Sequence, residues 1–336
     1  MTNKLVKVGL IGFGRHVDHS MLPNMLANEN TVIISLADLS EERREAAEHR
    51  FVGIKTYSTA EELLDNALND GINSVVISMD PAGHVAYTKL ALEAGLHVFV
   101  EKPVAIHSYE FDDLISLSEE KHLVTSVGTK WRYTEATKHM QKYTSENEGY
   151  QPKVLHLEAT FPTLFHNEMW GLTTKTQITF YDMFVHAFDY IESWAENSEI
   201  KNAKILYDND TTQVAHFELY NGEVYSLLDL VRGSQAYDMK LTATLENGAK
   251  LTMKNLTDIE LIDTESWLGT EGSLRDEPKK VWSQGRLYRG YARAGYKEEW
   301  DNFVDSVLNN SVASTNLVEA KKAIIKIEKA LESLDK

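Results

Sequence analysis

The tripeptide Glu101-Lys102-Pro103 places a lysine directly after the largely apolar run 97–100. Such a run is typical of a buried parallel strand, and open parallel sheets bind ligands outside the carboxyl ends of their strands. Pro103 favours an extended backbone at Lys102. In a partly dry cleft an ammonium group can donate a hydrogen bond to a substrate hydroxyl and stabilise the alkoxide that develops from it. The position of Lys102 therefore predicts a chemical role, whereas a lysine in a surface loop is the plain alternative.

A carboxylate and an imidazole, Asp182 and His186, lie four residues apart in a segment where Val185, Phe188 and Ile191 recur with helical spacing. Residues at this spacing project from one helix face, one turn apart. Histidine exchanges protons near neutral pH, and a nearby carboxylate can orient it or bind a substrate hydroxyl. The alternatives are a structural histidine or a zinc site. No third ligand stands at a recognisable spacing, so we expect no metal.

A glycine-rich turn follows the first apolar run of the chain. Two glycines let the backbone turn sharply and approach a pyrophosphate at the N-terminus of the next helix. An acidic residue, Asp38, ends the second apolar run, where it can bind the ribose hydroxyls of an adenosine. The alternative is an ordinary strand–turn–helix with a solvated aspartate. The residues expected at this dinucleotide site are Gly12, Phe13, Gly14, Arg15, His16 and Asp38.

A carboxylate at position 38 should repel a 2′-phosphate, so we expect NAD to be preferred over NADP. Two nearby cations, Arg15 and Arg43, could soften that preference and leave NADP possible. Val17 stands where the dinucleotide fingerprint has glycine or alanine, which predicts looser packing or a small shift of the helix.

The secondary structure expected around these residues differs between the first third of the chain and the rest. Up to about residue 125, apolar runs alternate with helical patterns, which predicts an α/β domain with a doubly wound parallel sheet. Ser40 reads as a helix N-cap, and Ser58 with Glu61 reads as a capping box. The expected strands are 5–11, 31–37, 74–79, 97–100 and 123–127.

Residues 126–336 are expected to form an α+β domain on a large open, mainly antiparallel sheet. Asn221-Gly222 and Asn247-Gly248 predict two hairpins. The tail 296–336 is helical in period and could pack on either domain. An open sheet needs a cover, which predicts a homodimer or homotetramer through this face. The expected strands are 154–161, 213–219, 223–230, 239–245 and 250–253.

Composition narrows the class of protein. The chain has 336 residues, 43% of them hydrophobic, and a formal net charge of −17 from 51 acidic and 34 basic residues. The negative charge disfavours nucleic acid and anionic membranes as partners. There is no cysteine, so disulfides and thiolate chemistry are excluded, and a cytoplasmic location is expected. No stretch is long enough to span a bilayer.

Taken in order, these motifs resemble the glucose-fructose oxidoreductase/inositol dehydrogenase (Gfo/Idh/MocA) family across nearly the whole chain. The resemblance implies an N-terminal Rossmann domain and a lysine–aspartate–histidine set formed by Lys102, Asp182 and His186. It departs from the family at Phe184, a bulky residue inside the Asp-x-x-x-His motif. By the same resemblance we expect further cofactor contacts from Ser78, Asp80, Pro81, His84, Glu101 and Lys102, and substrate contacts from Trp131, Arg132 and Trp170.

The reaction that the resemblance implies is hydride transfer between nicotinamide and a hydroxyl-bearing carbon of a sugar, cyclitol or related polyol. In it His186 takes the hydroxyl proton, Lys102 stabilises the oxygen and Asp182 orients the histidine or the substrate. Two alternatives remain open at this point. One is NAD-dependent glycoside cleavage through a transient oxidation, and the other is a non-catalytic dinucleotide sensor of the same fold.

Overall fold

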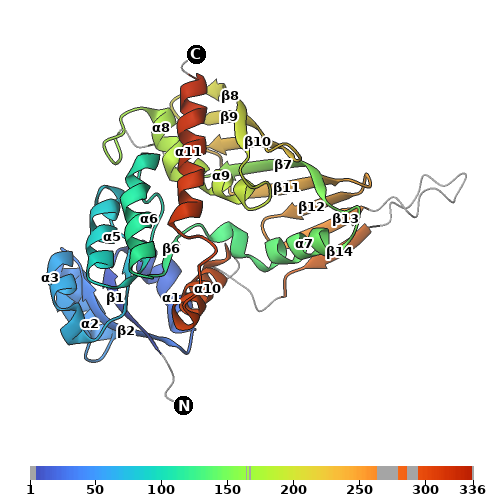
Figure 1. Cartoon of the computed structure of the whole chain (residues 1–336). Coiled ribbons are helices and arrows are strands. Elements are labelled where there is room, and N and C mark those ends of the chain that lie inside the picture. The colour runs from blue at the N-terminus through green and yellow to red at the C-terminus, as the bar shows by residue number, and fades with distance from the viewer. Residues whose placement is uncertain (1–4, 164, 166–167, 263–278, 286–293, 335–336) are drawn as a thin grey trace, which may run out of the picture. The chain divides into compact units, whose positions relative to one another are not determined.

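The computed structural model describes residues 5–163, 165, 168–262, 279–285 and 294–334 (Figure 1). The chain divides into two compact units. The first comprises Met1–Lys130 with Tyr296–Ile325, and the second comprises Trp131–Gly295 with Lys326–Lys336. The last helix, α11 (Leu317–Leu334), contributes residues to both. No helix in the described part of the chain is both long and apolar enough to cross a membrane.

A parallel sheet with strand order β3-β2-β1-β4-β5-β6 forms the centre of the first unit. This order is that of a Rossmann fold, whose ligand crevice lies at the carboxyl ends of the strands where the order reverses, here between β1 and β4. The expected α/β class is confirmed. The strands are β1 (Val6–Ile11), β2 (Thr31–Ala37), β3 (Lys55–Tyr57), β4 (Ser74–Ile77), β5 (His97–Val100) and β6 (Thr125–Val127).

Helices cover both faces of this sheet, which is why its strands are apolar along their length. They are α1 (Leu22–Leu26), α2 (Glu41–Arg50), α3 (Ala60–Asp65), α4 (Ala67–Asp70), α5 (His84–Glu93), α6 (Phe111–Glu120) and α10 (Tyr296–Asn309). On one face Phe99 packs against Trp300 and Phe303 of α10, with ring centroids 5.7 and 5.8 Å apart. On the other face Gly9 leaves room for Leu63 of α3.

One of the two predicted helix starts is confirmed and the other is shifted. Ser40 caps α2 by accepting a hydrogen bond from the backbone of the third helical residue (3.4 Å). The capping box predicted at Ser58 and Glu61 is wrong by one residue. Thr59 caps α3, and the carboxylate of Glu62 accepts the backbone N–H of Ser58 (2.9 Å). The sequence carries the same capping pattern in two overlapping registers, and burial of the apolar face of α3 selects the later one.

The second unit is built on an eight-stranded sheet with order β14-β13-β12-β11-β7-β10-β9-β8. The expected mainly antiparallel sheet is confirmed, but β7 and β10 run parallel. A parallel pair needs a crossover, which the helices and hairpins of residues 162–224 provide. The strands are β7 (Pro152–Phe161), β8 (Glu199–Asp208), β9 (Gln213–Tyr220), β10 (Tyr225–Arg232), β11 (Asp238–Leu245), β12 (Lys250–Lys254), β13 (Asp258–Ile262) and β14 (Lys279–Ser283).

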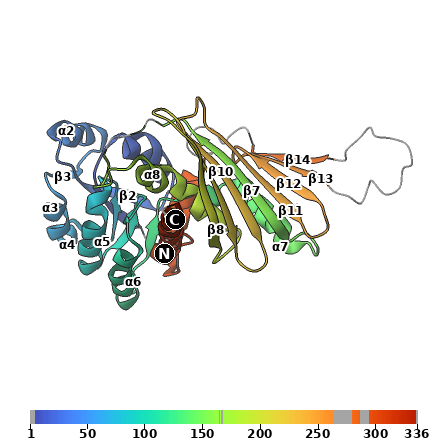
Figure 2. The same cartoon turned by 90° about the horizontal axis from the view of Figure 1, so that it is seen from above.

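Both predicted hairpins are confirmed. Asn221-Gly222 joins β9 to β10, and Asn247-Gly248 joins β11 to β12. The helices α7 (Glu135–Glu146) and α9 (Val185–Glu192) pack on one face of the sheet (Figure 2). There Phe188 contacts Phe217 with ring centroids 5.0 Å apart. The opposite face carries partly exposed polar side chains, among them Asp229, which binds histidines on two neighbouring strands.

Candidate active site

The glycine-rich turn lies at the carboxyl end of β1, beside the loop that follows β4. Gly12 has a φ of +90°, and a Cβ atom there would lie 2.2 Å from the carbonyl oxygen of Ser78. Only glycine can adopt this backbone at this distance. A Cβ atom on Gly14 would meet only the guanidinium of Arg43 within 4 Å, at 3.9 Å. The turn therefore exposes backbone to open space at the start of a helix, which fits the pyrophosphate of a dinucleotide.

Asp38 braces this turn from the end of β2. Its carboxylate accepts hydrogen bonds from the backbone of Phe13 (2.7 Å) and of Ser40 (2.9 Å). The side chain of Arg43, which is 54% exposed, lies 3.5 Å from the same carboxylate. Asp38 is thus a buried anion that fixes the dinucleotide turn to β2, in addition to the ribose contact that the sequence predicts.

Val17 introduces a change in the helix that begins after Gly14. The helix takes a π-helical turn over Val17–Met21 before α1, and the side chain of Val17 is fully buried. A π turn inserts one extra residue per turn and displaces the residues that precede it. This agrees with the small helix shift predicted from a bulky residue at position 17. Arg15 and His16 lie at the exposed start of the helix.

The helix start is tied to the tripeptide that follows β5. The Nε2 atom of His16 lies 2.9 Å from Oε1 of Glu101. The other carboxylate oxygen of Glu101 accepts the backbone N–H of Lys102 (3.2 Å). Burial alone would raise the pKa of Glu101, but the charge and hydrogen bond of His16 and the charges of Lys130 and Lys102 outweigh it and lower the pKa to about 2. Glu101 therefore joins the dinucleotide turn to the lysine segment.

Lys130 and Tyr296 complete this cluster within the first unit. The ammonium group of Lys130 lies 4.6 Å from the centroid of the Tyr296 ring, which is a cation–π contact. Burial lowers the pKa of Lys130, while the nearby carboxylates of Glu101 and Glu299 oppose that change. The ring of His16 also lies 5.8 Å from that of Tyr296. Glu101 and Lys130 thus belong to a charge cluster with His16 and Glu299, and the sequence did not reveal that these residues lie together.

Replacement of Glu101 by glutamine should flatten the acid dependence of stability. The pKa of Glu101 is lower in the folded chain than its usual 4.5, so its charge stabilises the fold above that pH and stops doing so as the pH falls toward 2. The stabilisation lost on full protonation is about 3 kcal/mol, of which about 2 kcal/mol is lost by pH 3. Urea unfolding between about pH 6 and pH 3 measures this loss as the difference in pH dependence between Glu101→Gln and the parent protein. The exposed Glu223, replaced by glutamine, is the matched control, and an equal pH dependence in the Glu101→Gln variant would contradict the assignment.

The other expected cofactor residues lie in the loop after β4. Asp80 caps a short 3-10 helix, Pro81–Gly83, by accepting the backbone N–H of Ala82 (2.9 Å). His84 is buried, and its Nδ1 lies 2.8 Å from the carbonyl oxygen of Pro103. Burial lowers the pKa of His84, against the effect of that hydrogen bond. The loop after β4 is thereby fixed to the lysine segment, in which the Lys102–Pro103 peptide bond is cis.

In the second unit, Asp182 lies in a π-helical turn, Phe180–Phe184, directly before α9. The expected single α-helix over Asp182 and His186 is therefore wrong in detail, because the π turn widens the spacing that places residues four apart on one face. Phe184 within it is fully buried against the aromatic core. The Oδ2 atom of Asp182 accepts a hydrogen bond from Nη2 of Arg232 (3.0 Å), whose side chain is 0% exposed.

His186 is the second residue after this turn, and it is 7% exposed. Its ring stacks on Trp131, with centroids 5.4 Å apart and planes at 22°. Trp131 in turn stacks on Phe161 at the end of β7, with centroids 6.0 Å apart. The stacking of His186 on Trp131, and of Trp131 on Phe161, fixes the orientation of the imidazole. The structure thus pairs His186 with Trp131 and, separately, Asp182 with Arg232, a partner that the sequence did not predict.

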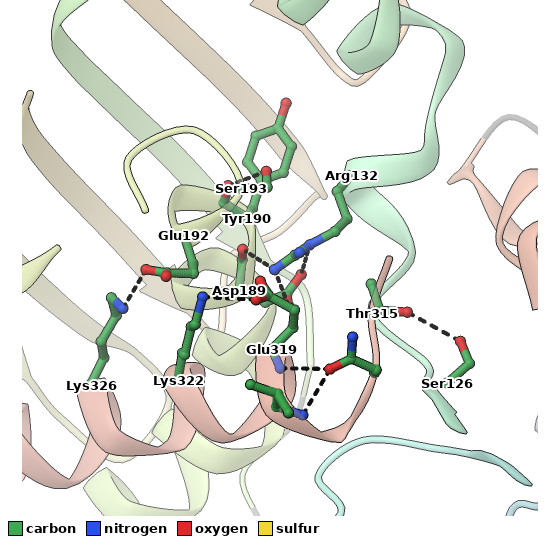
Figure 3. Close-up of polar contacts among 12 residues, drawn as sticks. Ser126, Arg132, Asp189, Tyr190, Glu192, Ser193, Thr315, Glu319, Lys322 and Lys326 are labelled. Atoms are coloured by element: carbon green, nitrogen blue, oxygen red, sulfur yellow. Dashed lines mark hydrogen bonds and ion pairs between the residues drawn. The ribbon is translucent and has the colours of Figure 1, made fainter. Parts of the chain in front are cut away.

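The other two residues expected to contact the substrate are Arg132 and Trp170. Arg132 forms a two-pronged ion pair with Asp189, through Nη2 to Oδ1 (2.7 Å) and Nε to Oδ2 (3.0 Å) (Figure 3). Both side chains are buried. Trp170 lies in a tight turn with a φ of +56°.

Figure 3 also shows a second buried ion pair, between Glu192 and Lys326 (2.6 Å). In the first unit it shows a hydrogen bond between Ser126 and Thr315 (3.2 Å).

Comparison with known proteins agrees with this geometry. Residues 6–129 match the family described as an oxidoreductase family with an NAD-binding Rossmann fold. The chain is 20% identical over 340 residues to the myo-inositol 2-dehydrogenase of Thermotoga maritima, covering 98% of this chain and 96% of the relative. It is similar in fold to a dehydrogenase from Chromobacterium violaceum (TM-score 0.89, 19% identity, covering 99% and 96% of the two chains).

A second solved structure with the same fold is levoglucosan dehydrogenase in complex with NADH and levoglucosan. It has a TM-score of 0.81 and 16% identity, and the match covers 98% of this chain and 97% of that one. The Rossmann unit, the dinucleotide turn and the family match all point to one class of protein. Residues 6–129 carry the NAD-binding Rossmann fold of the Gfo/Idh/MocA oxidoreductase family.

Proposed function

We propose that the protein transfers hydride between NAD(P) and a hydroxyl-bearing carbon of a sugar, cyclitol or related polyol. In this proposal the backbone of Gly12, Phe13 and Gly14 holds the pyrophosphate, and Asp38 accepts hydrogen bonds from the adenosine ribose. When bound, the nicotinamide supplies the redox chemistry. The rest of the reaction is proton transfer and electrostatics, which the chain's own side chains provide.

Three residues have distinct roles in this proposal. A ring nitrogen of His186 takes the proton of the substrate hydroxyl, because imidazole exchanges protons near neutral pH. The ammonium group of Lys102 donates a hydrogen bond to the same oxygen and stabilises its developing negative charge. The carboxylate of Asp182 accepts a hydrogen bond from a substrate hydroxyl and thereby orients the substrate. Charged and aromatic side chains together suit a polyhydroxylated molecule.

One observation carries the proposal. His186 is nearly buried and its orientation is fixed by the ring of Trp131, and four residues before it stands a carboxylate that forms an ion pair with a fully buried cation. An oriented histidine and a paired carboxylate on one short segment are the kind of groups that catalytic sites use. The relatives named as acting on inositol and levoglucosan support a polyol as the substrate.

The substrate class is tested by incubating the protein with NAD and a panel of inositols, sugars, anhydrosugars and glycosides. We expect NADH to accumulate with at least one polyol, together with the corresponding carbonyl product. Cleavage of a glycoside without net NADH would favour the redox-assisted reaction instead. Tight NAD binding with no turnover across the panel would favour the sensor. Self-association through the outward face of the sheet and a cytoplasmic location stay predictions.

The preference for NAD should depend on the charge of Asp38. An asparagine at this position keeps an oxygen that can accept the Phe13 N–H but removes the charge that repels a 2′-phosphate. We expect the Asp38→Asn variant to bind NADP more tightly, by about tenfold, while NAD affinity changes little. Fluorescence titration with both cofactors measures the ratio. An unchanged ratio in a folded variant would show that Arg43, not Asp38, governs the choice.

A further inference from the structure

Arg232, at the end of β10, is a buried cation that the roles proposed above do not use. Its side chain is 0% exposed, although it is the largest of the fully buried side chains. A guanidinium stays charged in proteins and is rarely buried without a counter-charge. The strand explains its orientation, since Leu228 and Leu230 are buried on the same face of β10 and side chains two apart along a strand point to one side.

The contacts of Arg232 lead to the proposed catalytic carboxylate. Its Nη2 atom donates to Oδ2 of Asp182 at 3.0 Å. Its guanidinium carbon lies 5.1 Å from the centroid of the Phe165 ring, a cation–π contact that adds to its fixation. Burial lowers the pKa of Arg232, and the charge and hydrogen bond of Asp182 oppose that change. The carboxylate of Asp182 is thus the counter-charge that the buried Arg232 requires.

We propose that Arg232 is a positioning residue of the active site, which holds the Asp182 carboxylate in one orientation for a substrate hydroxyl. This inference rests on the role proposed for Asp182. A carboxylate in a π turn lacks the regular helix spacing that would align it with His186, so a second anchor is needed to fix its direction. The guanidinium provides that anchor from another element, a sheet strand fifty residues later in the chain.

The test compares two variants that each remove a buried cation from the second unit. Arg232→Met removes the partner of Asp182. Lys326→Met removes the partner of Glu192, which lies 2.6 Å away, and the side chain of Lys326 is buried like that of Arg232. Both should unfold at lower temperature. Only Arg232→Met should also lower kcat, by about 10²-fold. Its KM for the polyol should also rise, while its affinity for NAD(P) stays that of the parent protein, because Asp182 binds the substrate and not the cofactor in the proposed function.

A second variant keeps the test informative if Arg232→Met does not fold. Arg232→Lys retains the charge without the planar fork, so we expect a kcat between those of Arg232→Met and the parent protein. Full activity of Arg232→Lys would overturn the positioning role, as would an Arg232→Met variant that differs from Lys326→Met in neither kcat nor KM for the polyol. Asp182→Asn is measured in parallel. If Asp182→Asn keeps normal turnover, the role proposed for Asp182 fails, whatever the Arg232 variants do.

Discussion

The His186→Ala variant is expected to lose about 10²- to 10⁴-fold in turnover while its affinity for NAD(P) stays near that of the parent protein. The imidazole is the only group in the proposal that accepts the substrate proton. The dinucleotide turn, by contrast, is built from β1, β2 and the loop after β4 in the first unit. Lys102→Met should behave similarly, because it removes the hydrogen bond to the developing alkoxide.

The matched control for His186 is His156, which lies on the outward face of the sheet and binds Asp229 at 2.6 Å. His156→Ala removes an imidazole of the same unit without touching Trp131 or Asp182, so we expect normal turnover. Thermal unfolding of all variants accounts for any loss of packing beside Trp131. Near-normal turnover in both His186→Ala and Lys102→Met would show that the chemistry does not depend on these residues.

Gly12→Ala is expected to abolish measurable cofactor binding and to destabilise the protein. The backbone at φ +90° costs a residue with a side chain about 1–3 kcal/mol. The new Cβ would also lie 2.2 Å from the carbonyl oxygen of Ser78, so β1 and the loop after β4 must separate. Titration with NADH and urea unfolding measure the two effects. This prediction has a large expected effect because the clash involves backbone, which cannot rotate away.

The Gly14→Ala variant distinguishes the loss of cofactor binding from the loss of stability, which Gly12→Ala causes together. A Cβ at Gly14 meets only the tip of the Arg43 side chain, at 3.9 Å, so the stability should stay within about 0.5 kcal/mol of the parent. Cofactor affinity should still fall, because the added methyl group occupies the space open to the pyrophosphate. If Gly14→Ala bound NAD(P) normally, the dinucleotide would have to approach a different surface of the turn.

Much of the first unit was predictable because its strands are buried on both faces. The apolar runs that form β1, β2, β4 and β5 are continuous, and continuous runs bounded by glycine and polar residues are a strong local signal. β3 (Lys55–Tyr57) was missed because it is short, polar and at the sheet edge. The edge strand β8 was missed for a related reason, since only one of its residues is buried and two register shifts interrupt its alternation. Edge strands are stabilised by pairing with a neighbour, which sequence periodicity does not report.

The candidate site was predictable where a motif is local. The Gly12 turn, Asp38 and Lys102 each follow a strand. Their residue types indicate a close approach to phosphate, a hydrogen bond to ribose and stabilisation of an alkoxide. The partnerships were not predictable, because Glu101 with His16 and Asp182 with Arg232 join residues far apart in the chain. A signal for Arg232 did exist. The alternation of β10 places it on the inward face, and an arginine in a buried position needs a counter-charge.

The π turns are the other feature that local patterns did not reveal. Each contains a bulky, fully buried residue, Val17 or Phe184, in a place where a smaller residue was expected. The hydrogen-bond pattern of one helix turn depends on how its side chains pack, and local sequence patterns do not report that packing.

The central claim is hydride transfer from a substrate carbon, and an isotope label tests it most directly. The protein is incubated with NAD and an active polyol that carries deuterium at the oxidised carbon, and the cofactor is recovered and analysed by mass spectrometry. We expect the recovered NADH to carry the deuterium, with a matching loss of label from the carbonyl product. NADH that carries no deuterium, or label that is returned entirely to the sugar after cleavage, would contradict the account.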